Sequence, residues 1–293
     1  MTDLYILTEF SLLGLLSSAV TALIAISFVL VFKGTRVVNF AVGEVMMLGA
    51  YLYYTGAVML KLPPVVALVF ALVGIAVACA LLERLILRPL SGQPTIAILM
   101  ATIGIASFVH GGVEIAWGQD PLETPALLPR MPLNLGEVMI PGAAIGNFLV
   151  SAVLIAVLLA FFRYSRIGIA LRATASDPVT AATLGIDVRA SQRLTWILSG
   201  SIGTVAGVLI VSSGGLSPAL ASTALSVFAV IILGGLDSIA GAILASLVIG
   251  WVESITVGYV GGKVRDVLPY LVVLAILVVR PYGLYGSRDI ERL

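Results

Sequence analysis

Long apolar stretches, separated by short breaks, run along almost all of this 293-residue chain. A run of about 20 apolar residues is long enough to cross a hydrocarbon core of ~30 Å as a helix. Lipid offers no partner to open backbone, and the alternating pattern of barrel strands is missing, so these spans must be helices. The sequence predicts an all-α, polytopic transmembrane helical bundle of about eight to nine spans. They lie near residues 10–32, 39–60, 63–83, 95–117, 143–163, 194–213, 222–235, 238–257 and 266–282.

Ionisable side chains are too few for a soluble protein of this size. The chain is 60% apolar and 11% charged, with a mean hydropathy of +1.16, whereas soluble domains are about 25% charged. One His and one Cys cannot build a His/Cys metal site or an internal disulfide. A net charge of +1 also lacks the basic footprint of nucleic-acid binding. We therefore expect a multi-pass protein of the inner (plasma) membrane.

The distribution of Lys and Arg over the loops predicts the orientation of the spans, because positively charged loops remain in the cytoplasm. With the N-terminus outside and the C-terminus cytoplasmic, Lys61, Arg130, Lys263 and Arg265 fall outside. Residues 222–257 must then leave from the outer face and return to it as a hairpin, whose first half, 222–235, either crosses fully or is re-entrant. The other twelve cations fall inside: Lys33, Arg36, Arg84, Arg88, Arg163, Arg166, Arg172, Arg189, Arg193, Arg280, Arg288 and Arg292.

A weak internal repeat relates spans 1–3 to spans 7–9. The segment NFAVGEVM at 39–46 is similar to DSIAGAIL at 237–244: each begins with a polar residue and has Gly four positions later. The third span ends in LRPL at 87–90 and the last in VRPY at 279–282. Repeats of this kind are common in transporters, whose paths lie between the halves; chance similarity in a Gly/Ala/Ile-rich sequence is the alternative.

The longest inside loop, 164–193, contains a short helix with a signal at each end. Asp177 is a good N-cap, Pro178 suits the first helical position, and Gly185 suits the left-handed C-terminal position. Such a short apolar helix is marginal in water, and Ala181 and Ala182 permit close approach. It should lie in a groove, either under its own bundle or on another chain.

Ionisable groups inside spans are costly and are therefore candidates for function. Glu44 follows Gly43 in the second span and is either a path-lining or gating carboxylate, or a group satisfied by backbone near the inner interface. His110 and Glu114 are four residues apart and share a helix face, where they can hold each other in a buried pair or relay a proton.

Glycine pairs and polar residues at span ends complete the candidates. Gly234 and Gly235 permit a helix break whose free backbone lines a cavity, or else only tight packing. Asn39 and Asp237 are expected to cap the two repeat helices. The candidate residues of a translocation path or gate are Asn39, Gly43, Glu44, His110, Glu114, Gly234, Gly235 and Asp237.

Four groups of motifs stand in order along nearly the whole chain. They are VVNFAVGE at 37–44 with MLGAY at 47–51, the run 172–209, ILGGLDSIAGA at 232–242 and RPYGLYG at 280–286. Together they resemble the LivH-type permease subunits of branched-chain amino acid ABC importers. Val42 stands where a His is common in that family, and Ser226–Phe228 stand where a Lys is common. These departures put the substrate in question more than the fold.

The resemblance implies that residues 1–293 form a single permease domain and that 164–193 is its cytoplasmic coupling loop. The helix bounded by Asp177 and Gly185, flanked by Arg172 and Asp187, would dock on an ATPase subunit. The implied partners are two cytoplasmic ABC ATPases, a second homologous permease, an extracytoplasmic solute-binding protein and membrane lipid. The proline-rich outer loop 118–142 would be a plausible rest for the binding protein, or a plain cover of the bundle.

No Gly-x-x-x-x-Gly-Lys-Ser/Thr phosphate loop occurs in the sequence. The chain is therefore not expected to be an enzyme or to hold a cofactor, and ATP and Mg²⁺ would bind to the partner ATPases. The resemblance implies transport of leucine, isoleucine and valine, with other amino acids, urea or short amides as alternatives. A self-contained secondary transporter or channel is the rival from another class, although the scarcity of charge inside the spans argues against ion coupling.

Overall fold

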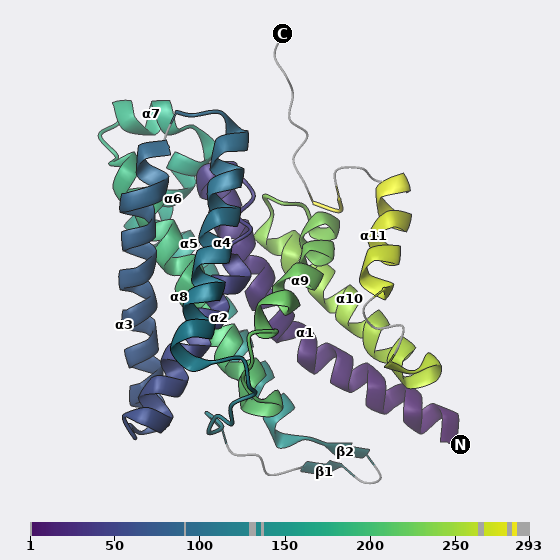
Figure 1. The fold of residues 1–293 in the computed structure, drawn as a ribbon. Helices are drawn as coiled ribbons and strands as arrows, with labels where there is room; N and C mark the ends of the chain where they lie inside the picture. Colours follow the sequence, from purple (N-terminus) through teal and green to yellow (C-terminus); the bar gives the residue numbers. More distant parts are fainter. Residues whose placement is uncertain are drawn as a thin grey trace.

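The computed structural model describes residues 2–90, 92–128, 133–135, 138–262, 267–279 and 283–285. Within these ranges the protein is a bundle of helices with one small β-hairpin (Figure 1). The long helices are α1 (Thr2–Thr35), α3 (Pro64–Leu82), α4 (Thr95–Trp117), α5 (Gly142–Tyr164), α8 (Val188–Gly214) and α10 (Ile239–Val260). The shorter ones are α2 (Val42–Tyr54), α6 (Arg166–Ser176), α7 (Pro178–Thr183), α9 (Leu220–Gly234) and α11 (Leu268–Val279).

Three short helical segments and two strands complete the described elements. Helix α2 continues as the π-helix η1 (Thr55–Met59). Helix α3 continues as the π-helix η2 (Glu83–Leu87) and the 3₁₀-helix η3 (Arg88–Leu90). Strands β1 (Leu133–Leu135) and β2 (Val138–Ile140) pair antiparallel, with Leu133 opposite Ile140.

Each of the nine predicted apolar segments coincides with a helix, so the prediction of a polytopic helical bundle is confirmed. Six described helical stretches are long and apolar enough to cross a membrane. Helix α9 is apolar but has 15 residues, which at 1.5 Å per residue is only about 22 Å. This helix is therefore shorter than a hydrocarbon core of ~30 Å.

The loops gather at two opposite ends of the bundle. At one end, which we call the α7 end, Arg36 donates a hydrogen bond to the carbonyl of Ala175 at 3.3 Å, and Leu284 donates to the carbonyl of Leu233 at 2.7 Å. At the other, which we call the hairpin end, Leu122 and Leu216 form an isolated β-bridge. Consecutive long segments run in alternating directions between these ends (Figure 1).

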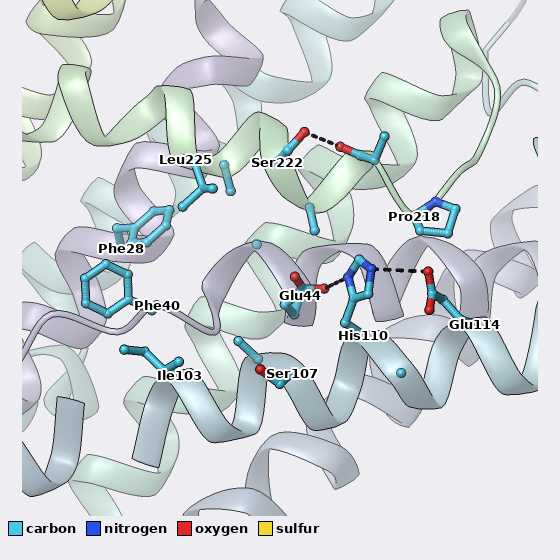
Figure 2. Close-up of a pocket in the computed structure, with 16 residues that line it drawn as sticks. Phe28, Phe40, Glu44, Ile103, Ser107, His110, Glu114, Pro218, Ser222 and Leu225 are labelled. Atoms are coloured by element: carbon cyan, nitrogen blue, oxygen red, sulfur yellow. Dashed lines mark hydrogen bonds and ion pairs between the residues drawn. The ribbon is translucent and has the colours of Figure 1, made fainter. Parts of the chain in front are cut away.

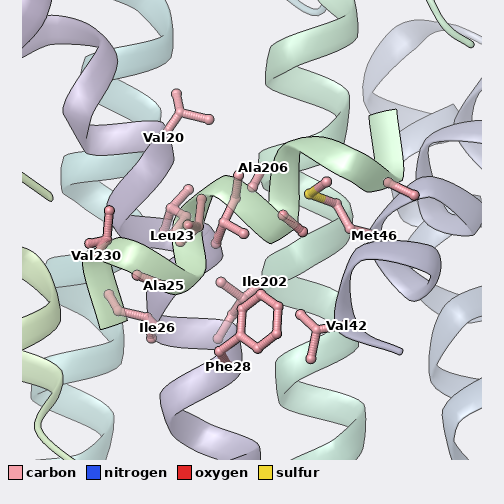
Figure 3. Close-up of a cluster of buried hydrophobic side chains, with 14 of the residues drawn as sticks. Val20, Leu23, Ala25, Ile26, Phe28, Val42, Met46, Ile202, Ala206 and Val230 are labelled. Carbon is pink, nitrogen blue, oxygen red and sulfur yellow. The ribbon is translucent and has the colours of Figure 1, made fainter. Parts of the chain in front are cut away.

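The buried core lies between α1, α2, α8 and α9. Figure 3 shows Leu23 and Phe28 of α1 facing Met46 of α2, Ile202 of α8 and Val230 of α9. The Ser199 hydroxyl of α8 donates to the backbone carbonyl of residue 27 in α1 at 2.7 Å. Polar bonds of this kind join helices that have no hydrophobic driving force between them in lipid.

Two expectations about helix caps need correction. The N-cap of α10 is Ser238, whose hydroxyl accepts from the N–H of Gly241 at 3.0 Å, and not Asp237. Asn39 accepts from the N–H of Ala41 at 2.9 Å, but α2 begins one residue later without a side-chain cap. The adjacent serine is correctly placed for the N-terminus of α10, and Asn39 instead shapes the turn that leads into α2.

Candidate translocation cavity

A cavity of about 800 Å³ lies inside the bundle between α1, α2, α4 and the start of α9. One of its ends is polar and the other is apolar (Figure 2). The polar end holds Glu44, His110 and Glu114, and the apolar end holds Phe28, Phe40 and neighbouring aliphatic groups. Pockets with an apolar wall and a few convergent polar groups are the usual binding sites for small molecules.

The polar end is a chain of three ionisable side chains. His110 Nδ1 lies 3.1 Å from Glu44 Oε2, and its Nε2 lies 3.5 Å from Glu114 Oε1. Glu114 Oε1 also accepts a hydrogen bond from Gln119 Nε2 at 3.1 Å. An imidazole can donate to both carboxylates only when it is protonated; as a neutral ring it donates to one of them. The cluster therefore forms an anionic wall that suits a cationic group of a ligand.

Helix geometry explains how these three residues meet. His110 and Glu114 are one turn apart on α4 and face the same way, as predicted from their spacing. Glu44 lies in the first turn of α2, where the helix dipole stabilises a carboxylate. The sequence did not indicate that Glu44 and His110, separated by 66 positions, would pair.

Gly43 allows the start of α9 to approach the start of α2. A Cβ at Gly43 would lie 2.6 Å from the carbonyl oxygen of Ala221 and 2.9 Å from the Cβ of Ala224. Both helix N-termini consequently meet beside the cavity, and Pro218 and Ser222 line its wall next to Glu44. Gly43 itself lines the cavity.

The apolar end is closed by three phenylalanine rings that the sequence did not single out. Phe40 stacks on Phe228 with ring centroids 5.5 Å apart, and Phe28 meets Phe228 edge to face at 5.0 Å. Such aromatic pairs contribute about 0.5–1.5 kcal/mol beyond their burial. They come from α1, α9 and the turn before α2, so no local pattern joins them.

Gly234, Gly235 and Asp237 do not line this cavity. They lie at the α7 end, where a Cβ at Gly234 would come within 2.5 Å of the Gly241 carbonyl. Gly235 adopts φ +100°, a left-handed conformation that ends α9. Their role is helix termination and close packing of α9 on α10. Asn39 likewise faces away from the central cavity, toward the α7 end.

The short helix α7 has both of its predicted end signals. The Asp177 carboxylate accepts from the N–H groups of Val179 and Thr180 at 2.9 and 3.0 Å. At the other end, Gly185 has φ +84° and donates to the carbonyl of Ala182, while Ile186 donates to that of Ala181. These two bonds form a Schellman motif, so α7 is a helix of about one and a half turns whose two ends are both fixed by hydrogen bonds.

Hydrogen bonds also set the charge state of the α7 cap. The Thr180 hydroxyl, followed by the N–H groups of Thr180 and Val179, holds the pKa of the Asp177 carboxyl below its ordinary value. Asp187 caps the next helix, α8, by accepting from the N–H of Ala190 at 3.0 Å. The two flanks of α7 are thus anchored by acidic caps.

The faces of α7 differ from one expectation. Ala181 is 2% exposed and packs against its own bundle, whereas Val179 and Leu184 are 74% and 76% exposed. Ala182 is also exposed, as is Arg172 on the preceding helix. Only one of the two alanines can therefore touch another protein, and Val179, Ala182 and the C-cap Leu184 are among the exposed residues around α7.

Among the residues that the structure describes, no group of three or more His, Cys, Asp or Glu side chains could hold a metal ion. The long apolar helices and the amphipathic cavity define a helical membrane permease. The family model described as "Branched-chain amino acid transport system / permease component" matches residues 11–277. The chain belongs to this family.

Several characterised relatives match over almost their whole length. The chain is 30% identical to the high-affinity branched-chain amino acid transport permease BraD of Pseudomonas aeruginosa, and 30% identical to LivH of Escherichia coli K12. Each alignment covers 96% of both chains. A probable LivH of Methanocaldococcus jannaschii is 31% identical over 93% of this chain and 90% of its own.

A solved structure, PsaBC from Streptococcus pneumoniae in complex with Fab, aligns with a TM-score of 0.45 and 15% identity. The alignment covers 95% of this chain and 91% of the other. A likeness at this level carries no information about function.

Proposed function

We propose that this chain is the permease subunit of an ABC importer and forms part of the path for leucine, isoleucine and valine through the inner membrane. The observation that carries the proposal is the amphipathic central cavity, because its two ends match the two parts of such an amino acid. The anionic wall of Glu44 and Glu114 suits the ammonium group, and the rings of Phe28 and Phe40 suit the branched side chain. Family membership supports the same substrate class.

The proposed topology has nine crossings, with the N-terminus outside and the α7 end in the cytoplasm. The alternating helix directions and the placement of charge support it. Of the Lys and Arg residues that the structure describes, Lys61 lies at the hairpin end and the other nine lie at or near the α7 end. Helices α9 and α10 would form the predicted hairpin. The 15 residues of α9 start inside the bundle, and the segment 215–219, which leads there from the hairpin end, would complete this crossing. Arg130, Lys263, Arg265, Arg280, Arg288 and Arg292 lie outside the described residues.

In this proposal α7 is the coupling helix. Its apolar side chains Val179 and Leu184 are exposed on the face that would be cytoplasmic, and its two caps make it rigid enough to transmit movement. ATP and Mg²⁺ would bind to two partner ATPases, whose closure would shift α7 and change the side to which the cavity opens.

A second homologous permease would cover the outer face of α4. Phe108 and Ile115 on this helix do not line the central cavity and are 75% and 90% exposed. On the same helix, a Cβ added at Gly104 would meet nothing within 4 Å, so a neighbouring helix can approach closely.

A solute-binding protein would deliver the amino acid at the hairpin end. There the loop after α4 is fixed to the bundle by the Leu122–Leu216 bridge and by the Thr124 hydroxyl, which donates to the carbonyl of Val211 at 3.1 Å. A loop held in this way offers a firm platform. Pro129, Pro132 and Glu137 of the same loop are outside the residues whose side chains are described.

Uptake of radiolabelled leucine tests the proposal. Cells that lack this chain should lose high-affinity uptake, and a plasmid copy should restore it. Excess unlabelled isoleucine and valine should compete, whereas urea and acetamide should not. Unchanged leucine uptake in the deletion strain, or competition by urea alone, would contradict the proposal.

A further inference from the structure

A second, smaller cavity of about 190 Å³ lies at the α7 end. Its wall comes from α1, the turn before α2, the π-helix η2, α4 and α8. The central cavity and the coupling helix do not use it. Its lining includes the ionisable side chains Glu83 and Arg88, the polar Asn39, Thr102 and Gln192, and the ring of Trp196.

Glu83 is the unusual member of this wall. It is 5% exposed, and its carboxylate has no hydrogen-bond or ion-pair partner among the residues that the structure describes. In those residues the fully buried polar side-chain atoms without a partner are the hydroxyls of Tyr51 and Ser151, so the Glu83 carboxylate instead opens to the cavity, where a ligand can reach it. Glu83 is also the first residue of a π-helical turn, a local geometry that is frequent at functional sites.

Arg88 supplies the opposite charge on the same cavity. It is exposed at one edge and lies one turn beyond Glu83, at the start of η3. The two side chains do not form an ion pair with each other, although both line the same space. A carboxylate and a guanidinium that line one cavity without pairing with each other are complementary to a ligand that carries both an ammonium and a carboxylate group.

The remaining wall is suited to the rest of such a ligand. Val31, Ile98 and Trp196 form an apolar surface, and Thr102 and Gln192 provide hydrogen-bonding groups. A lone metal cation is a poorer match, because the cavity is several times larger than one water molecule (~30 Å³) and Arg88 would repel it. The chemistry therefore favours a small amino acid with an apolar side chain.

The position of this cavity relates it to the central one. Asn39 lines the smaller cavity and its neighbour Phe40 lines the central cavity; Thr102 and Ile103 on α4 are divided in the same way. The N–H of Phe40 donates to the Thr102 hydroxyl at 3.4 Å and joins the two halves of this partition. Neighbouring residues on two elements thus line different cavities, so the two cavities lie next to each other in the bundle.

We propose that the Glu83–Arg88 cavity is a second binding site for an apolar α-amino acid, on the α7 side of the central cavity. Glu83 binds the ammonium group, Arg88 binds the carboxylate, and the wall beside Trp196 receives the side chain. The choice of leucine as the ligand rests on the proposed function. The inference that the ligand carries both an ammonium and a carboxylate group rests on Glu83 and Arg88 and is independent of that function.

Trp196 provides the experiment with a reporter inside the site. Its indole lines the cavity and is 4% exposed. The full-length chain is reconstituted in nanodiscs with Trp117→Phe and Trp251→Phe, so that Trp196 is the only tryptophan. Its fluorescence is titrated with L-leucine, with isopentylamine, which has only the amine, and with 4-methylpentanoate, which has only the acid.

Leucine should change the emission saturably, and each single-charge analogue should bind at least tenfold more weakly. Glu83→Gln and Arg88→Gln should each weaken leucine binding at least tenfold, whereas Arg84→Gln and Glu123→Gln should leave leucine binding unchanged. Arg88 is exposed, so its variant tests the site even if Glu83→Gln fails to fold. Equal leucine affinity in both site variants, no response to leucine, or equal binding of the analogues would overturn the inference.

The result is separable from the test of the proposed function. If cells take up leucine but the Trp196 fluorescence of the purified chain does not respond to leucine, only the second site is overturned. A charge-dependent Trp196 response without any leucine uptake would support the site and contradict the proposed function.

Discussion

Helix α7 and the central cavity are held together by different kinds of interaction. The ends of α7 are determined by neighbours in sequence: Asp177 caps residues two and three positions later, and Gly185 closes the helix at its end. The cavity depends on Glu44 and His110, which are 66 positions apart and meet only because α2 and α4 pack together. Local changes should therefore disturb α7 by itself, whereas the cavity should respond to changes in helix packing.

The largest effect is expected on the exposed face of α7. Ala182→Arg places an unpaired charge in the proposed ATPase interface, where burying such a charge costs about 2–5 kcal/mol. Leucine uptake should fall by about a hundredfold or more, and the ATPase should no longer co-purify. Ser213→Arg adds the same charge at an exposed position of the hairpin end, far from α7, and should leave co-purification of the ATPase unchanged. Normal co-purification with Ala182→Arg would show that α7 is not the docking element.

A smaller effect is expected in the polar wall of the cavity. Glu44→Gln keeps the shape of the side chain but removes the charge that faces His110 at 3.1 Å. Hydrogen bonds to charged groups contribute about 1.5–3 kcal/mol, so leucine uptake should fall about tenfold at an unchanged protein level. Glu9→Gln, on α1 and outside both cavities, is the matched control. Equal leucine uptake by the two variants would show that the Glu44 carboxylate does not take part in transport.

Helix packing at the cavity can be tested with two glycines. Gly43→Ala would place a Cβ 2.6 Å from the Ala221 carbonyl, and overpacking of this kind costs about 1–3 kcal/mol. The melting temperature of the purified protein should fall by several degrees. Gly111→Ala lines the same cavity with open space around its Cβ and should leave the melting temperature unchanged or higher. Equal melting temperatures would mean that α2 and α9 do not touch at Gly43.

The smallest effect concerns the pH dependence of α7. The folded-state pKa of Asp177 is lowered by its hydrogen bonds with Thr180 and Val179. The cap therefore stabilises α7 above the unfolded value of about 3.9, and this contribution is lost as pH falls through the lower, folded value. The protection factors of the Val179 and Thr180 amides, which are corrected for the intrinsic pH dependence of exchange, should fall at acidic pH in wild type. Asp177→Asn, which caps without a charge, should show a smaller change; an identical pH profile would argue against the carboxylate cap.

Much of the fold was predictable because it depends on local rules. Apolar length located all nine helical segments, and cap residues located α7 to within one residue at each end. Of the two caps that were predicted wrongly, Asp237 lies next to the true cap at Ser238, and Asn39 lies in the turn just before α2. In these places the residues that determine the structure are close together in the sequence.

The site was less predictable because it depends on how the helices turn toward one another. The spacing of His110 and Glu114 indicated a shared face, but not that Glu44 would join it. Spacing also did not indicate that Ala181 would face inward. The aromatic contacts of Phe228 and the buried carboxylate of Glu83 arise from packing between distant segments, and no sequence pattern marks them.

The most direct test of the central claim measures access to the cavity. The native Cys79 is fully buried, so a water-soluble thiol reagent should react with a single added cysteine and hardly at all with Cys79. Ser107→Cys places a thiol in the cavity wall, and Phe108→Cys places one on α4 outside the lining. A water-soluble methanethiosulfonate should block leucine uptake only in Ser107→Cys, and leucine with its transport partners should protect it. Equal labelling of both positions, or a block that leucine does not reduce, would contradict the claim that this cavity is the path.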